Sequence, residues 1–251
     1  MPKRSLLMAA SLMLSAIAVA EDNKPWKVDV DLGVISTSGN TDTTSVQTKI
    51  DARQTLDRWE NQYIIGGLYK QDQVAADDGS KSDEKTAEKY FGSAKTAYLL
   101  GVERSYIFGY VSHAHDKFGA YRDYTTVAMG YGDWIISRPN LTWFAEAGPG
   151  YQRGKKPLDT QPVSYSTESG MIFRGATELI WKFSPTAEFK QLLSVESGED
   201  NTRTIGETSV SASINSAMKM KVGVNIANDT DVAPGKKHTD TTTFVNLVYS
   251  F

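Results

Sequence analysis

The sequence predicts an all-β fold: a closed antiparallel up-and-down transmembrane β-barrel of about twelve strands with a polar lumen. Three observations predict it. Twelve stretches alternate between polar and apolar residues. Their connections alternate between longer polar loops and short turns. The last stretch, 241–251, ends on Phe251 within a strand, as expected where a last strand pairs with the first one. For this stretch alone, an ordinary soluble edge strand is the alternative.

The N-terminal residues predict export. Lys3 and Arg4 precede an apolar run over 6–19, and Ala18-Val19-Ala20 is a small-x-small cleavage pattern. The alternative is an uncleaved membrane anchor, which needs about 20 apolar residues, more than this run provides. We therefore expect a cleaved signal peptide over residues 1–20 and a single barrel domain over 21–251.

Composition excludes several classes of function. Removing Lys3 and Arg4 from the 27 basic residues leaves 25 against 30 acidic ones, so the formal charge changes from -3 to -5. This balance gives no support for nucleic-acid binding. The chain has no cysteine, which excludes disulfides, thiolate metal sites and thiol catalysis. After residue 20 no apolar run reaches the length of a spanning helix, so a membrane location requires strands.

The strands are expected from period-two alternation, with charged residues opposite apolar ones in most of them. The expected strands are 26–35, 46–53, 59–69, 90–100, 105–115, 124–134, 141–151, 171–183, 186–195, 203–214, 218–226 and 241–251. Both faces of 124–134 are mixed, so its facing cannot be assigned. Pro149 has no backbone donor, so we expect a bulge or the end of the strand at Gly148-Pro149-Gly150.

The connections predict the orientation. The longer polar connections are 36–42, 70–89, 116–123, 152–169, 196–202 and 229–240, and the short turns are 57–58, 101–104, 137–140, 184–185 and 215–216. Long loops at one rim and short turns at the other are typical of outer-membrane barrels. We expect the rim with the short turns and both ends of the domain to face the periplasm.

The tryptophans predict a membrane girdle. All five lie at strand ends beside the short turns or the termini: Trp26, Trp59, Trp134, Trp143 and Trp181. Because indole prefers the membrane interface, these residues and Phe251 predict an aromatic girdle at one rim. Core packing is the alternative for each tryptophan taken singly. A weaker second girdle is expected from Tyr69, Tyr90, Tyr124 and Tyr151.

The size of the barrel predicts which face is inside. At twelve strands the interior is too wide to be filled by apolar side chains alone, so the apolar face should meet lipid and the charged face the lumen. The candidate lumen residues are Asp29, Asp31, Lys49, Asp51, Arg53, Lys95, Glu146, Arg174, Glu178, Lys182, Glu188, Lys190, Glu207, Lys219 and Lys221. The alternative is a soluble periplasmic barrel or sandwich with the reverse facing.

Several motifs along the mature chain carry a family likeness. They are Leu32-Gly33, the Ser-Gly-Asn-Thr-Asp-Thr-Thr segment 38–44, Asp116-Lys117-Phe118 with Arg122, Gly130-Tyr131-Gly132 and Gly148-Pro149-Gly150-Tyr151. In order and spacing, the chain resembles the salt-induced outer-membrane protein family, whose domain has no assigned function. The resemblance implies an outer-membrane barrel of Gram-negative bacteria with a link to envelope or osmotic stress. It implies no catalytic residues.

One group of residues is a candidate for chemistry at the loop rim: His113, His115, Asp116 and Arg122. A lipid-modifying or proteolytic barrel needs a nucleophile with a positioned histidine, and no such motif surrounds these residues. A metal site would lack a second set of ligands. We therefore expect a polar rim cluster in which Arg122 pairs with Asp116 and Asp123, and we expect no catalytic residue, no metal and no cofactor.

Function is expected to follow from the lumen. Its charges are of both signs and can pair across a narrow space, so the sequence favours a small passive channel and leaves open a non-conducting barrel that acts through its loops. The expected partners are outer-membrane lipid, lipopolysaccharide and the barrel assembly machinery, the last through strand 241–251. An acidic segment, 72–88, is expected to be a solvated loop rather than a calcium or lipopolysaccharide site. The solute and the oligomeric state are left open.

Overall fold

The fold is given by a computed structural model, which describes residues 25–37, 43–75, 81–101, 104–158, 164–233 and 235–251. The predicted signal peptide, residues 1–20, lies outside the described residues. Among those described, no helix is long and apolar enough to cross a membrane.

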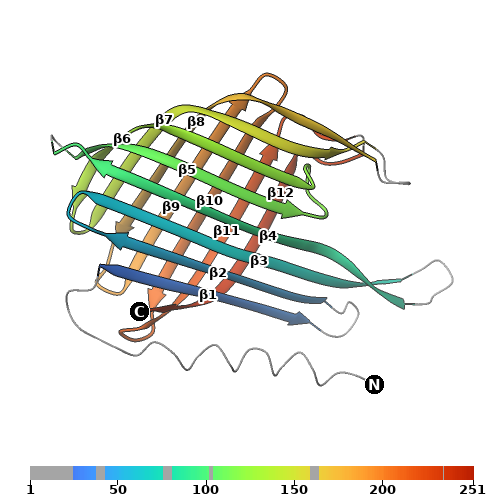
Figure 1. The fold of residues 1–251 in the computed structure, drawn as a ribbon. Helices are drawn as coiled ribbons and strands as arrows, with labels where there is room; N and C mark the ends of the chain where they lie inside the picture. Colours follow the sequence, from blue (N-terminus) through green and yellow to red (C-terminus); the bar gives the residue numbers. More distant parts are fainter. Residues whose placement is uncertain (1–24, 38–42, 76–80, 102–103, 159–163, 234) are drawn as a thin grey trace.

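The described residues form twelve antiparallel strands, each paired with its neighbours in sequence (Figure 1). Strand β1 pairs with β12, so the barrel is closed. The strands are β1 (Trp26–Thr37), β2 (Thr43–Thr55), β3 (Trp59–Ala75), β4 (Lys81–Leu99), β5 (Ser105–Asp116), β6 (Asp123–Arg138), β7 (Leu141–Pro157), β8 (Tyr165–Lys182), β9 (Ala187–Gly198), β10 (Thr202–Ser213), β11 (Met218–Asp229) and β12 (Thr239–Ser250). The predicted closed, up-and-down all-β barrel is confirmed.

The two ends of the barrel differ in their connections. The end that carries connections 56–58, 100–104, 139–140, 183–186 and 214–217 is called the turn rim, and the opposite end the loop rim. Phe251 lies at the turn rim beside the start of β1, where its backbone N–H donates to the carbonyl of Val28 (Figure 1).

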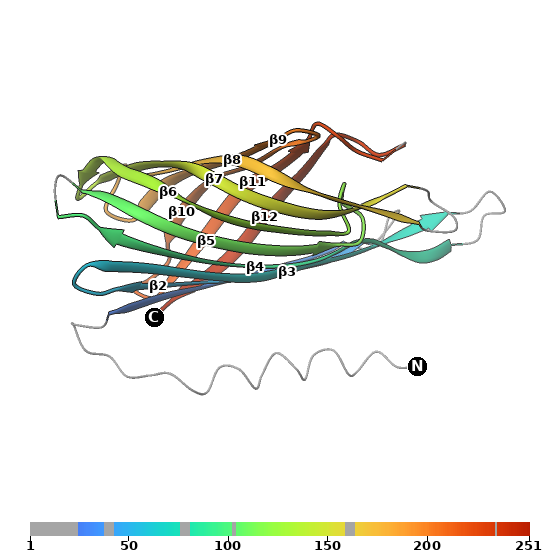
Figure 2. The same cartoon turned by 45° about the horizontal axis from the view of Figure 1, so that its top comes forward.

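Two predicted loops are instead extensions of strands. Residues 70–89 and 152–169 were expected to be long loops, but β3 and β4 pair as far as Ala75 and Lys81, and β7 and β8 as far as Pro157 and Tyr165. Figures 1 and 2 show both hairpins projecting at the loop rim. The sequences of these extensions lack the alternation of a lipid-facing strand, but the two backbones of each hairpin are paired with each other. Polarity alone therefore gave the wrong prediction.

The facing of β6 changes within the strand. The β6–β7 register shifts between Trp134 and Ile136, so Ile135 is an additional, bulged residue. Trp134 lies opposite Phe144 on the inner face, whereas Ile136 lies opposite Trp143 on the outer face. Residues two apart thus face opposite sides across the bulge. The predicted strand 124–134 ends before the bulge, and its facing could not be assigned because both of its faces mix polar and apolar residues.

The expected bulge or strand end at Pro149 is wrong. Strand β7 continues through Pro149, and its register with β6 is the same on both sides of it. The neighbouring glycine explains this continuity. A Cβ on Gly148 would lie 1.9 Å from the carbonyl oxygen of Met129 and 2.6 Å from the Cα of Gly130, so glycine allows the two backbones to come unusually close.

The outer wall is apolar and carries most of the predicted girdle. At the turn rim Trp26, Trp59, Trp181 and Phe251 are 42–48% exposed, and Trp143 lies on the same wall, where its indole donates to Thr177. Trp134 does not belong to this set. It packs inside the barrel against Phe144, at 5.3 Å between ring centroids, because it precedes the bulge and shares the inward parity of Tyr124 and Ala128.

The second predicted girdle also needs a correction. Tyr124 is 7% exposed and packs inside the barrel against Tyr121, whereas Tyr90 and Tyr151 lie exposed on the outer wall.

Candidate functional site: a charged lumen

A cavity of about 300 Å³ occupies the turn-rim end of the lumen. Ten of the predicted lumen residues line it: Asp29, Asp31, Lys49, Asp51, Arg53, Lys182, Glu188, Lys190, Lys219 and Lys221. They come from β1, β2, β8, β9 and β11, so the inward face of strands on both sides of the barrel supplies the charges. The remaining five predicted lumen residues lie deeper, in the ion-paired layers described next.

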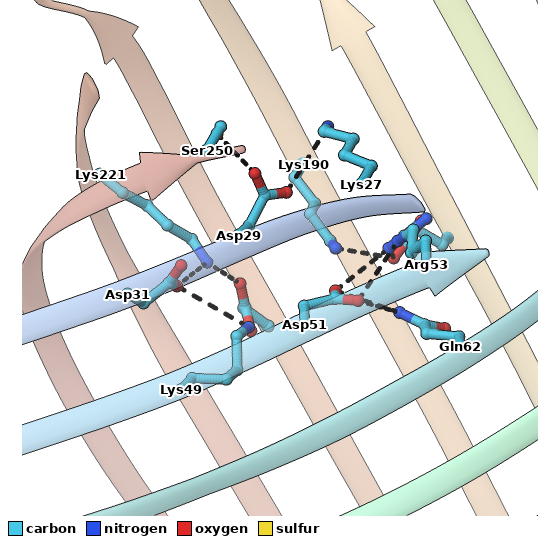
Figure 3. A network of polar contacts seen from close by, with 12 residues as sticks. Lys27, Asp29, Asp31, Lys49, Asp51, Arg53, Gln62, Lys190, Lys221 and Ser250 are labelled. Atoms are coloured by element: carbon cyan, nitrogen blue, oxygen red, sulfur yellow. Dashed lines mark hydrogen bonds and ion pairs between the residues drawn. The ribbon is translucent and has the colours of Figure 1, made fainter. Parts of the chain in front are cut away.

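The first ion-paired layer joins β1 and β2 to β10 and β11 (Figure 3). The Lys221 ammonium lies 3.2 Å from Asp31 and 2.8 Å from Glu207, and the Lys49 ammonium lies 3.4 Å from Glu207 and 4.0 Å from Asp31. Each base therefore faces both acids. Asp31 is 3% exposed, and such a buried carboxylate requires partners of this kind.

A second group spans the full width of the lumen. The Arg53 guanidinium on β2 lies 3.4 Å from Glu178 on β8, six strands away in either direction around the ring. The Lys190 ammonium also lies 2.7 Å from Glu178. Asp51 lies 3.4 Å from Arg53 and accepts a hydrogen bond from Gln62 at 3.0 Å. Figure 3 shows Arg53, Asp51 and Gln62 gathered beside Lys190 from the opposite wall. This contact crosses the lumen directly.

A third layer lies between the cavity and the loop rim. Glu146 on β7 accepts from Lys95 on β4 at 2.5 Å, from Arg174 on β8 at 2.9 Å and from the Tyr106 hydroxyl at 3.0 Å. Arg174 also lies 3.7 Å from Glu196 on β9. We call Lys95, Glu146, Arg174 and Glu196 the middle layer. Its four charges balance, and all of its members are largely hidden from solvent.

Aromatic side chains fill one side of the lumen, which alternation did not predict. Tyr106 and Phe108 on β5 are buried and pack with Trp134 and Phe144. The Lys95 ammonium lies 4.5 Å from the Phe144 ring centroid, and the Arg174 guanidinium 4.0 Å from that of Tyr110. These are cation–π contacts, so the aromatic wall holds the bases of the middle layer. The inward residues of β5 are Tyr106, Phe108 and Tyr110, and this aromatic alternation was the signal in the sequence that could have predicted the aromatic wall.

At the loop rim, segments from opposite sides of the barrel meet. Connection 117–122 leads from β5 to β6, and connection 230–238 leads from β11 to β12, six strands from β5. Ala120 and Tyr121 pack with Val232, and the Lys236 ammonium donates to the carbonyl of Phe118 at 2.8 Å. We call these two connections the outer cap.

Charged side chains tie the outer cap to the wall. Lys156 pairs with Asp231 and, at 3.5 Å, with Glu168. The Tyr121 hydroxyl donates to Glu168 at 2.8 Å. Burial, and then this hydrogen bond to a carboxylate, raise the pKa of Tyr121 well above its usual value. The outer mouth of the lumen is thus closed by packing and by ion pairs together.

The predicted rim cluster is not one cluster. His113 and His115 face outward, where His113 Nδ1 lies 2.8 Å from the Thr125 hydroxyl and His115 Nδ1 lies 2.6 Å from Asp123. Asp116 faces the other way: it accepts from the backbone N–H groups of Phe118 and Gly119 and pairs with Lys89. Because alternate residues of β5 face opposite sides of the sheet, the two histidines and Asp116 lie on different faces.

The expected ion pair of Arg122 with Asp116 and Asp123 is also wrong. Within the described ranges the Arg122 side chain has no ion pair, and its backbone N–H and carbonyl bond to Lys155 and Asp116. In the same part of the chain, no group of three or more histidine, cysteine, aspartate or glutamate residues is placed to hold a metal ion.

An apolar outer wall around an ion-paired lumen, in a barrel whose described residues form twelve strands, defines the class: a transmembrane-type β-barrel. The chain belongs to the family described as protein of unknown function, DUF481, whose family model matches residues 30–251. This match confirms the resemblance to a family with no assigned function. The uncharacterized protein YdiY of Escherichia coli (strain K12) is 26% identical, over 98% of this chain and 96% of that protein.

Among solved structures, the chain is similar to an autotransporter translocator domain and to two porins. The translocator domain of the autotransporter NalP from Neisseria meningitidis is 13% identical, with a TM-score of 0.49 over 92% of this chain and 90% of that one. The KdgM porin in complex with disordered oligogalacturonate is 11% identical, with a TM-score of 0.45 over 90% and 99%. The NanC porin is 8% identical, with a TM-score of 0.45 over 89% and 97%.

Proposed function

We propose that this protein is an outer-membrane barrel that passes small solutes when open and is closed in the state described. The observation that carries the proposal is how the lumen is closed. Its turn-rim end holds a charged cavity of about 300 Å³, and ion pairs between side chains close the space above it. Because side chains rather than backbone make this closure, it can open by rotamer changes without refolding the wall.

The outer wall supports the membrane location. On β7 the outward residues from Trp143 to Tyr151 are all apolar, and Arg153 follows. Ten residues rise about 33 Å along a strand, which is about 25 Å along the barrel axis at a tilt of about 40°. This height equals the apolar band of outer-membrane barrels. The wall therefore fits a bilayer without further elements.

Single-channel conductance of the refolded protein in planar bilayers tests the channel. We expect small ohmic steps for the wild type, and larger steps for Arg53→Ala and Arg174→Ala, because Arg53 reaches across the lumen to Glu178 and Arg174 belongs to the middle layer. Arg138→Ala is the matched control: it removes the same charge from an exposed position at the turn rim and should leave the steps unchanged. Heat-modifiable gel mobility verifies that each variant is folded.

A specific observation favours a second candidate, a non-conducting barrel that acts through its loops. The outer cap closes the outer mouth with apolar packing as well as with charges. A variant that loosens it, Lys236→Ala with Tyr121→Ala, distinguishes the two candidates. Suppose that the folded wild type, Arg53→Ala, Arg174→Ala and this cap variant all give no conductance steps over a wide voltage range. The channel is then refuted and the role of the loops is favoured.

We propose two finer points. The family resemblance supports a non-enzymatic role linked to salt or envelope stress. Deleting the gene should then slow growth at high salt, and normal growth under salt and envelope stress would count against the link. The aromatic end of β12 supports recognition by the barrel assembly machinery, so replacing Phe251 with Ser should lower the amount of folded barrel in cells.

A further inference from the structure

The outer wall of β5 and β7 carries a cluster of basic side chains at the loop-rim edge of the apolar band. We call it the interface cluster, and its members are His113, His115, Arg153 and Lys155. The sheet register brings them together across β6. His113 lies opposite Thr125, which lies opposite Arg153. In the next row His115 lies opposite Asp123, which lies opposite Lys155.

The change from apolar to basic occurs at the same level on three strands. One row nearer the turn rim, Val111, Val127 and Tyr151 lie side by side, 44%, 54% and 49% exposed. The next outward residue on β7 is Arg153, about 25 Å above Trp143 along the barrel axis. The interface cluster therefore lies at the level of the head groups of the outer leaflet.

Neighbouring side chains hold both imidazole rings in place. His113 Nδ1 contacts the Thr125 hydroxyl, and His115 Nδ1 contacts Asp123 while its ring stacks on Tyr90 at 4.7 Å. Both contacts use Nδ1, so Nε2 of each ring has no hydrogen bond within the described part of the chain. The rings are thus oriented before any ligand arrives.

The cluster has an excess of positive charge. Lys155 lies 3.4 Å from Asp123, the single acidic side chain within the two rows. Glu88, on the neighbouring strand β4, is paired with Lys85 and Lys117. Arg153 is exposed and has no ion pair or hydrogen bond with any part of the chain that the structure describes. Its five guanidinium donors are therefore available.

We infer that the interface cluster binds the phosphate groups of an outer-leaflet glycolipid of the lipid A type. The inference rests on the outer-membrane location proposed above. Arginine pairs with phosphate through two parallel hydrogen bonds, and the Lys155 ammonium adds further donors. His113 adds an Nε2–H donor in the tautomer in which its Nδ1 accepts from Thr125. The site faces the bilayer and borders apolar side chains, so the acyl chains of the same lipid can cover Val111, Val127 and Tyr151. A phosphate ion without acyl chains would contact only the basic side chains and not the apolar ones.

Thermal unfolding in lipid nanodiscs tests the inference. The full-length mature barrel is placed in phosphatidylcholine nanodiscs alone, or with diphosphoryl lipid A, or with phosphatidylglycerol at equal negative charge, or with inorganic phosphate in the buffer. We expect lipid A to raise the Tm by about 5 °C and the other additions to raise it by much less. The double variant Arg153→Gln/Lys155→Gln should lose most of this shift and keep its Tm in phosphatidylcholine.

The control is Arg58→Gln/Arg138→Gln, which removes two exposed arginines at the turn rim, and lipid A is present in both leaflets of the disc. This control should keep the shift. Native mass spectrometry should show lipid A bound to wild type and about tenfold less to the double variant. Equal shifts for phosphatidylglycerol and lipid A, or an unchanged shift in the double variant, would overturn the inference. A barrel that does not fold into phosphatidylcholine at all would instead refute the proposed membrane location.

Discussion

Replacing Arg174 with alanine should cost about 3 to 4 kcal/mol of unfolding free energy. Arg174 is 6% exposed and holds Glu146 and Glu196 at 2.9 and 3.7 Å. Breaking a buried ion pair from one side costs about 3–5 kcal/mol, because an unpaired charge stays buried. The lower end applies to the ion pairs, since Glu146 keeps Lys95 at 2.5 Å. Loss of the cation–π contact with Tyr110 adds about 1 kcal/mol.

A second substitution identifies the carboxylate that Arg174→Ala leaves without an ion pair. Glu196 loses its only ion pair among the described residues and keeps the hydrogen bond from Thr126. Adding Glu196→Gln to Arg174→Ala should therefore recover about 1–2 kcal/mol. Arg138→Ala, at an exposed position, should change stability by less than about 0.5 kcal/mol.

Urea unfolding of the refolded protein in detergent micelles, followed by tryptophan fluorescence and by gel mobility, measures all of these differences. A loss below about 1 kcal/mol for Arg174→Ala would refute a buried, ion-paired middle layer. So would a double variant no more stable than the single one, because the carboxylate of Glu196 would then not be the source of the cost.

Three further predictions concern the wall and the outer cap. Gly148→Ala should prevent folding or cost several kcal/mol, because its Cβ would lie 1.9 Å from a backbone oxygen, whereas Gly170→Ala, with open space around it, should cost about 1 kcal/mol or less in the same urea assay. Because the raised pKa of Tyr121 favours the neutral hydroxyl, its contribution to stability is complete below about pH 10 and is lost as the pH rises further. Ultraviolet titrations of wild type and Tyr121→Phe should therefore coincide up to about pH 11, and an extra ionising tyrosine in wild type would contradict this. Among single-tryptophan variants, lipid brominated near the head group should quench Trp181 strongly and Trp134 weakly; equal quenching would contradict the inward facing of Trp134.

Much of the barrel could be predicted because a lipid-exposed wall requires strict alternation. The inward placement of residues such as Asp29, Asp31, Lys49 and Lys221 follows from period two once the strand number makes the interior polar. The same rule gave the strand order, since each strand of an up-and-down barrel pairs with its neighbours. What alternation cannot give is the position of a bulge, and one extra residue at Ile135 reversed the facing of everything after it in β6.

The partners within the lumen depend on more than facing. Arg53 meets Glu178 from the opposite side of the ring, and this pairing is set by the stagger of twelve strands around the barrel rather than by any local spacing. The aromatic wall was missed for a related reason. The interior was expected to be too wide for apolar side chains alone to fill, so charged residues were expected to line it. Tyr106 and Phe108 nevertheless pack there beneath Lys95, and Tyr110 packs beneath Arg174, so these rings help to hold both charges.

The two closures of the lumen lie in series, and they differ in what can open them. The outer cap combines the packing of Val232 on Tyr121 with ion pairs, so salt weakens only part of it. The middle layer is held by charges, by cation–π contacts and by hydrogen bonds from the hydroxyls of Tyr106 and Thr126, and its members are hidden from screening ions. In the channel proposed above, a solute that enters from the loop rim would have to loosen the cap first, after which water and ions would reach the middle layer and weaken its pairs. This order would make the cap the controlling gate, and a partner that binds the loops would then also set the conductance.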